Sequence, residues 1–82
     1  MSEADKMFEE LCYEKEENFE LEYIRFRKYI FESEFQDIIF DLKNNLINCA
    51  RENMKHYMTI TTILSMQELK AINQKCKELG WL

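Results

Sequence analysis

The sequence of 82 residues contains no proline, one glycine, Gly80, and one histidine, His56. Phosphate-binding loops need several glycines at fixed spacing, so the chain has no mononucleotide or dinucleotide motif. His56 lies in a threonine-rich stretch with no carboxylate pattern beside it, whereas nucleophilic catalysis needs a base within hydrogen-bond reach of its nucleophile. We therefore predict that the protein has no catalytic residues and is not an enzyme.

Long apolar runs are missing as well. None approaches the roughly 20 residues that a membrane-spanning helix needs. The first six residues are polar and acidic, where a signal peptide would be basic and then apolar. These absences predict a cytoplasmic protein with no membrane partner. A chain of this length has room for one core between two layers, so we expect a single domain over residues 1–82.

The three cysteines are Cys12, Cys49 and Cys76. None belongs to a CxxC pair, and an odd number suits reduced thiols better than a disulfide framework. A zinc site would need all three together with His56, brought in from four separate segments. We expect small, buried residues with reduced, unpaired thiols, no metal and no cofactor.

Acidic residues are concentrated at the beginning of the chain. The formal net charge is −5, and residues 1–20 carry eight acids against two lysines, whereas residues 51–82 are slightly basic. An acidic end of this kind can steer a basic partner, or it can simply keep the protein soluble. The candidate partner-binding residues are the glutamates off the apolar stripe of this region, namely Glu9, Glu10, Glu16 and Glu17.

Two segments have the apolar spacing of amphipathic helices. In the first, Ser2 can cap the start, the stripe consists of Ala4, Met7, Phe8 and Leu11, and the helix should end near Cys12 or Tyr13. In the second, Ser65 and Glu68 form a capping box, and Gly80 suits a left-handed terminating residue. Its stripe consists of Leu69, Ile72, Cys76 and Leu79.

Two other segments, residues 19–31 and 55–63, alternate in the manner of strands. In the first, one face holds Ile24, Phe26 and Ile30, and the other holds Tyr23, Arg25, Arg27 and Tyr29. Aromatic and guanidinium groups that alternate along a sheet face can stack bases, so these last four residues are the alternative, ligand-binding candidates. The acidic net charge argues against nucleic-acid binding. Residues 14–18 are interpreted as a polar break.

Residues 35–51 fit two structures. A helix would align Phe35, Ile38, Ile39, Leu42, Leu46 and Cys49. A hairpin with its turn at Asn44 and Asn45 would pair Leu42 with Ile47 and Phe40 with Cys49. The hairpin explains more of the apolar residues, because the helix leaves Phe40 and Ile47 exposed.

The opening MSEADKMFEEL (residues 1–11) and the closing MQELKAINQKCKELGW (residues 66–81) resemble the ends of small uncharacterised proteins of phages and prophages of Firmicutes. The resemblance implies strands in the middle of the chain, which favours the hairpin, and a location in the cytoplasm of an infected or lysogenic bacterial host. Those proteins tend to have glycine at the position of Cys12, and the resemblance carries over no functional residue.

These observations together predict an α+β fold in which a small antiparallel sheet of three to four strands is covered by the N-terminal and C-terminal helices. The function that we expect is that of a phage accessory protein that binds another protein. It would act as a stoichiometric inhibitor of a host or defence enzyme, such as a CRISPR effector or nuclease. The alternatives are nucleotide or nucleic-acid binding through the Tyr/Arg face, and a structural module that forms a homodimer through an open sheet edge.

Overall fold

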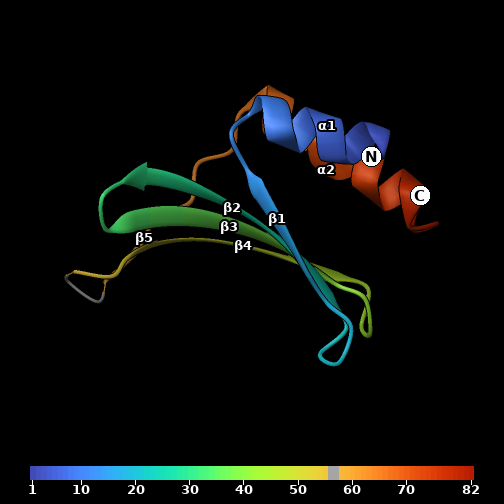
Figure 1. The fold of residues 1–82 in the computed structure, drawn as a ribbon, viewed down its shortest axis with the longest axis horizontal. Coiled ribbons are helices and arrows are strands. Elements are labelled where there is room, and N and C mark those ends of the chain that lie inside the picture. Colours follow the sequence, from blue (N-terminus) through green and yellow to red (C-terminus); the bar gives the residue numbers. More distant parts are fainter. Residues whose placement is uncertain (56–57) are drawn as a thin grey trace.

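The computed structural model describes residues 1–55 and 58–82, in which two helices lie on one side of an antiparallel sheet (Figure 1). In chain order the elements are α1 (Glu3–Glu10), β1 (Glu14–Asn18), β2 (Tyr23–Phe31), β3 (Glu34–Asp41), β4 (Leu46–Asn53), β5 (Met58–Ile60) and α2 (Met66–Glu78). Each strand pairs with the next one in the chain, so the sheet order is β1-β2-β3-β4-β5. The predicted α+β class is confirmed.

The sheet has one strand more than expected because residues 14–18 form β1 instead of a polar break. Both faces of this strand are polar, so it has no apolar alternation by which a sequence reveals a strand. It is held by its ladder with β2, in which Glu16 lies opposite Arg25. Residues 19–22, expected to begin the next strand, form the connecting loop, where the Asn18 side chain accepts a hydrogen bond from the Leu21 amide at 2.8 Å. Among the described residues of the predicted strand 55–63, Met58–Ile60 form a strand; His56 and Tyr57 lie outside the described residues.

The predicted hairpin in the middle of the chain is confirmed, but its register differs by two residues. Phe40 lies opposite Ile47 and Ile38 opposite Cys49, so the loop has four residues, 42–45, instead of two. Asp41 sets this longer loop, because its carboxylate accepts hydrogen bonds from the amides of Lys43 and Asn44 at 3.1 and 3.2 Å. An even shift keeps every side chain on its face.

The core lies between the helices and one face of the sheet. Phe8 of α1 stacks on Phe26 of β2 with ring centroids 4.0 Å apart, and Phe40 of β3 meets both rings edge-on. Ile38 and Ala71 are fully buried beside them. The predicted faces of β2 are confirmed for Ile24 and Phe26, which are both buried.

A largely buried polar cluster joins α2 and the turn after α1 to the sheet, beyond this apolar core. Its members are Tyr13, Lys28, Gln36, Arg51 and Glu68. Gln36 is fully buried; its amide nitrogen donates to the Tyr13 hydroxyl at 2.8 Å and to the Glu68 carboxylate at 2.9 Å, and its oxygen accepts from Arg51 at 3.0 Å. Tyr13 also donates to Glu68. Each buried polar group of the cluster therefore has a partner.

Helix α1 ends at Glu10, slightly earlier than predicted, and the chain then reverses through a left-handed residue. Cys12 has φ 70°, and the amides of Cys12 and Tyr13 donate to the carbonyls of Glu9 and Phe8 at 2.9 and 3.0 Å. This closure normally uses glycine, because a side chain crowds the backbone in the left-handed region.

Cys12→Gly is therefore expected to stabilise the protein by about 0.5–1 kcal/mol, since relief of the left-handed strain exceeds the added entropy of the unfolded chain. Chemical denaturation of both proteins under reducing conditions measures this difference. Cys12→Ala keeps the Cβ and is the matched control. Equal midpoints for the glycine and alanine variants would contradict the assigned strain.

Helix α2 has the predicted capping box. The Glu68 amide donates to the Ser65 hydroxyl at 3.1 Å, and the Ser65 amide donates to the Glu68 carboxylate at 2.8 Å. At the other end Gly80 has φ 77°, and the Trp81 amide donates to the Cys76 carbonyl at 2.8 Å. Both predicted boundaries of this helix are confirmed.

Ser65→Ala removes one of the two hydrogen bonds of the box, and we expect it to lower the free energy of unfolding by about 0.5–2 kcal/mol. Urea denaturation followed by circular dichroism measures the loss. Ser65→Asp, which restores an acceptor at the same position, should recover most of it. No recovery would mean that the serine acts through something other than its cap.

Candidate interaction surface on the uncovered face of the sheet

No described helix covers the side of the sheet opposite α1 and α2, and we call this side the uncovered face (Figure 1). The predicted stripe lies on it: Tyr23, Arg25, Arg27 and Tyr29 alternate along β2 with the buried residues Ile24 and Phe26. The ladder places Arg25 beside Ile39 and Arg27 beside Asp37 of β3. The stripe is therefore one continuous feature, as the sequence predicted.

Arg27 is already paired within the protein. Its Nε and Nη2 atoms donate to the two carboxylate oxygens of Asp37 at 2.7 and 2.9 Å, and its guanidinium lies 3.9 Å from the centre of the Phe35 ring. The hydrogen bonds from Arg27 to Asp37 also raise the pKa of the guanidinium. Asp37 is only 7% exposed, so this bidentate pair is shielded from solvent.

Arg25 is paired with β1. Its Nη2 atom donates to Glu16, which also accepts a hydrogen bond from the Tyr23 hydroxyl at 3.0 Å. The Nε atom of Arg25 is buried and has no partner among the described residues. Phosphate groups would have to displace carboxylates from both guanidiniums, which argues against the stripe as a platform for nucleotides.

Carboxylates outnumber cations on the described strands of the uncovered face. The strand registers place five carboxylates on it against the two paired guanidiniums; the carboxylates are Glu14, Glu16, Asp37, Asp41 and Glu52. Glu14 and Glu52 are exposed and make no ion pair with other described residues. Free negative charge is therefore present at both sides of this face, on β1 and on β4.

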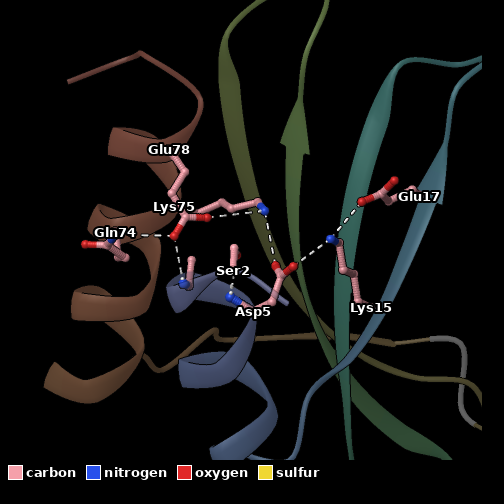
Figure 2. Close-up of polar contacts among 8 residues, drawn as sticks. Ser2, Asp5, Lys15, Glu17, Gln74, Lys75 and Glu78 are labelled. Atoms are coloured by element: carbon pink, nitrogen blue, oxygen red, sulfur yellow. Dashed lines mark hydrogen bonds and ion pairs between the residues drawn. The ribbon is translucent and has the colours of Figure 1, made fainter.

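The four predicted partner-binding glutamates do not form one surface. Glu9 and Glu10 are exposed on α1, and Glu16 lies on the uncovered face. Glu17 lies on the helix side, where Lys15 bridges it to Asp5 at distances of 2.7 and 2.8 Å (Figure 2). The sequence could not separate them, because the turn between α1 and β1 decides which acid faces which side.

A shallow groove of about 510 Å³ lies on the uncovered face beside the β1–β2 and β3–β4 loops. Its apolar lining includes the side chains of Leu21, Tyr23, Ile39 and Leu46. Leu46 is 59% exposed and Leu21 is 70% exposed, which is high for leucine. This site could not be predicted from the sequence, because its lining combines residues of the β1–β2 loop, β2, β3 and β4. Leu21, which lies between Glu20 and Glu22, was the one available signal.

The two edges of the sheet differ in charge. The outer edge of β1 carries Glu14, Lys15, Glu16 and Glu17, and charged edges resist pairing with another strand. At β4, the pairing with β5 covers only Arg51 to Asn53, so residues 46–50 have no strand beyond them in the described chain. The predicted homodimer would use this second edge, and it stays a prediction.

Neither described helix is long and apolar enough to cross a lipid bilayer. Within residues 1–55 and 58–82, no three histidine, cysteine or acidic side chains gather as a metal site would require, and burial raises the pKa of the Cys49 and Cys76 thiols.

Comparisons with family models, curated proteins and solved structures find no match to this chain.

Proposed function

We propose that the protein acts by binding another protein through the uncovered face. The observation that carries the proposal is the combination on that face of exposed apolar side chains with carboxylates that outnumber the cations. Monomeric soluble proteins rarely expose large contiguous apolar patches, and such patches mark interaction sites. A binding protein of 82 residues also needs no cleft deep enough for catalysis.

The resemblance of both ends of the chain to phage and prophage proteins suggests the biological role that we propose. In this role, the protein is a small phage accessory protein that binds and inhibits a host or defence enzyme, such as a nuclease, in a stoichiometric complex. Acidic surfaces suit such targets, because enzymes that act on nucleic acids carry basic grooves.

Two charge-reversal variants locate the binding surface. Glu14→Lys with Glu52→Lys changes the uncovered face, and Glu9→Lys with Glu10→Lys changes α1 by the same net charge. We expect the first pair to abolish inhibition and the second to leave it largely intact, because rim charges act through their position and not only through the total charge. The measurement is the plating efficiency of a phage on bacteria that have an intact defence system and express each variant.

Three other outcomes count against this assignment. Greater sensitivity to the α1 pair would place recognition on the acidic helix. Loss of inhibition in Arg25→Ala, with both glutamate pairs tolerated, would favour the nucleotide-binding alternative; Arg25 is preferable to Arg27 here because its partner Glu16 is itself exposed. Unchanged plating with the unmodified protein across defence systems would overturn the inhibitor function.

A further inference from the structure

The groove beside the β1–β2 and β3–β4 loops has the chemistry of a peptide-binding site. Its floor is formed by side chains of β2, β3 and β4, among them Tyr23 and Ile39, both half-buried. Leu21 and Leu46 form exposed apolar walls. A groove of about 510 Å³ is large enough to take apolar side chains from a partner, and its lining mixes apolar side chains with four polar residues, which suits an amphipathic peptide segment.

The surroundings of the groove are acidic. Asp41 lies in its lining, and hydrogen bonds from Asn44 hold the pKa of this carboxyl below its ordinary value, so it stays ionised. Glu20 and Glu22 flank Leu21 in the β1–β2 loop and are exposed. Lys43 is the one cation in the lining. Carboxylates thus outnumber cations around an apolar groove.

We infer that this groove binds a basic, amphipathic segment of a partner protein, with apolar side chains in the groove and lysine or arginine residues beside Asp41, Glu20 and Glu22. The inference rests on the proposed protein-binding function and specifies the partner. Charge complementarity selects this occupant. A second copy of the chain would bring two acidic loops together. An anionic ligand would be repelled by the same carboxylates, and no free guanidinium is present among the described residues to bind it.

The test uses three synthetic peptides with one helical pattern: leucine with lysine, leucine with glutamate, and serine with lysine. Each is titrated into isotopically labelled full-length protein, and NMR shifts of the methyl groups are followed. We expect the leucine–lysine peptide alone to shift Leu21, Ile39 and Leu46, and added salt to weaken its binding. Leu46→Asp should lower its affinity by about tenfold or more. Phe31→Asp, a matched change at a 72% exposed residue of β2, should have no effect.

Several results would overturn the inference. Shifts that gather on α1 would indicate non-specific attraction of the peptide to acidic residues. Equal binding of the serine–lysine peptide would remove the role of the apolar groove. Binding of the leucine–glutamate peptide, or shifts of the groove methyls with protein concentration alone, would assign the groove to an anionic ligand or to a second copy. Failure of the plating assay would leave these titrations unaffected, so the two proposals are tested independently.

Discussion

Phe26→Ala is expected to lower the free energy of unfolding by about 3–5 kcal/mol, the usual loss for a phenylalanine removed from a closed core. Phe26 is 1% exposed, stacks on Phe8 and meets Phe40 edge-on, so its removal leaves a cavity that three elements would have to fill. Small domains have total stabilities toward the low end of about 5–15 kcal/mol, so the variant should be partly unfolded at room temperature. Urea denaturation followed by circular dichroism measures the difference.

Phe31→Ala is the matched control for this variant. Phe31 belongs to the same strand but is 72% exposed, and its truncation should change the stability by no more than about 0.5 kcal/mol. Similar losses for the two variants would contradict the placement of the core between the helices and this face of β2.

Glu68→Ala is expected to have the second largest effect on stability, a loss of about 2–4 kcal/mol. The carboxylate accepts hydrogen bonds from Tyr13, Gln36 and the Ser65 amide, and it lies 3.7 Å from the Lys28 ammonium. Alanine would leave the buried Tyr13 and Gln36 donors without this acceptor. Glu68→Gln keeps the shape and one acceptor oxygen, so it should be less harmful. An equal loss in both variants would mean that the charge, and not the acceptor geometry, holds the cluster.

The same residue predicts a pH dependence. Burial raises the pKa of Glu68, but hydrogen bonds from Tyr13 and Ser65 and the charge of Lys28 outweigh burial and hold it below its ordinary value. The stabilisation from its ionised form is therefore present above the unfolded pKa of about 4.3 and is lost as the pH falls through the folded pKa. The unfolding midpoints of the unmodified protein and of Glu68→Gln should keep a constant separation above about pH 5 and converge as the pH falls below about 4.3. Parallel curves would contradict the lowered pKa.

The helices could be predicted from the sequence because their signals are local. Ser65 and Glu68 are three residues apart and make one capping box, and Gly80 supplies the left-handed residue that ends the helix. The strand β1 could not be predicted, because its contacts to Arg25 and Asp5 come from other elements. The register of the hairpin also depended on a single side chain, Asp41, which sets the length of the loop.

The candidate site was only partly predictable for the same reason. Alternation along β2 placed the Tyr/Arg stripe on one face, but nothing near Arg25 and Arg27 in the sequence identifies Glu16 and Asp37 as their partners. Because both guanidiniums are neutralised by these pairs, the stripe is part of an acidic surface and not a cationic platform. The groove likewise joins Leu21 and Leu46, which only the two adjacent hairpins bring together.

The most direct test of the account is the plating efficiency of a defence-sensitive phage on bacteria that express Leu46→Asp or Phe31→Asp. Both substitutions place the same charge at an exposed apolar residue, one in the groove and one at the opposite end of β2. The account predicts that Leu46→Asp loses the ability to protect the phage, while Phe31→Asp protects it as well as the unmodified protein does. Full protection by Leu46→Asp, with comparable levels of folded protein, would contradict binding through the uncovered face.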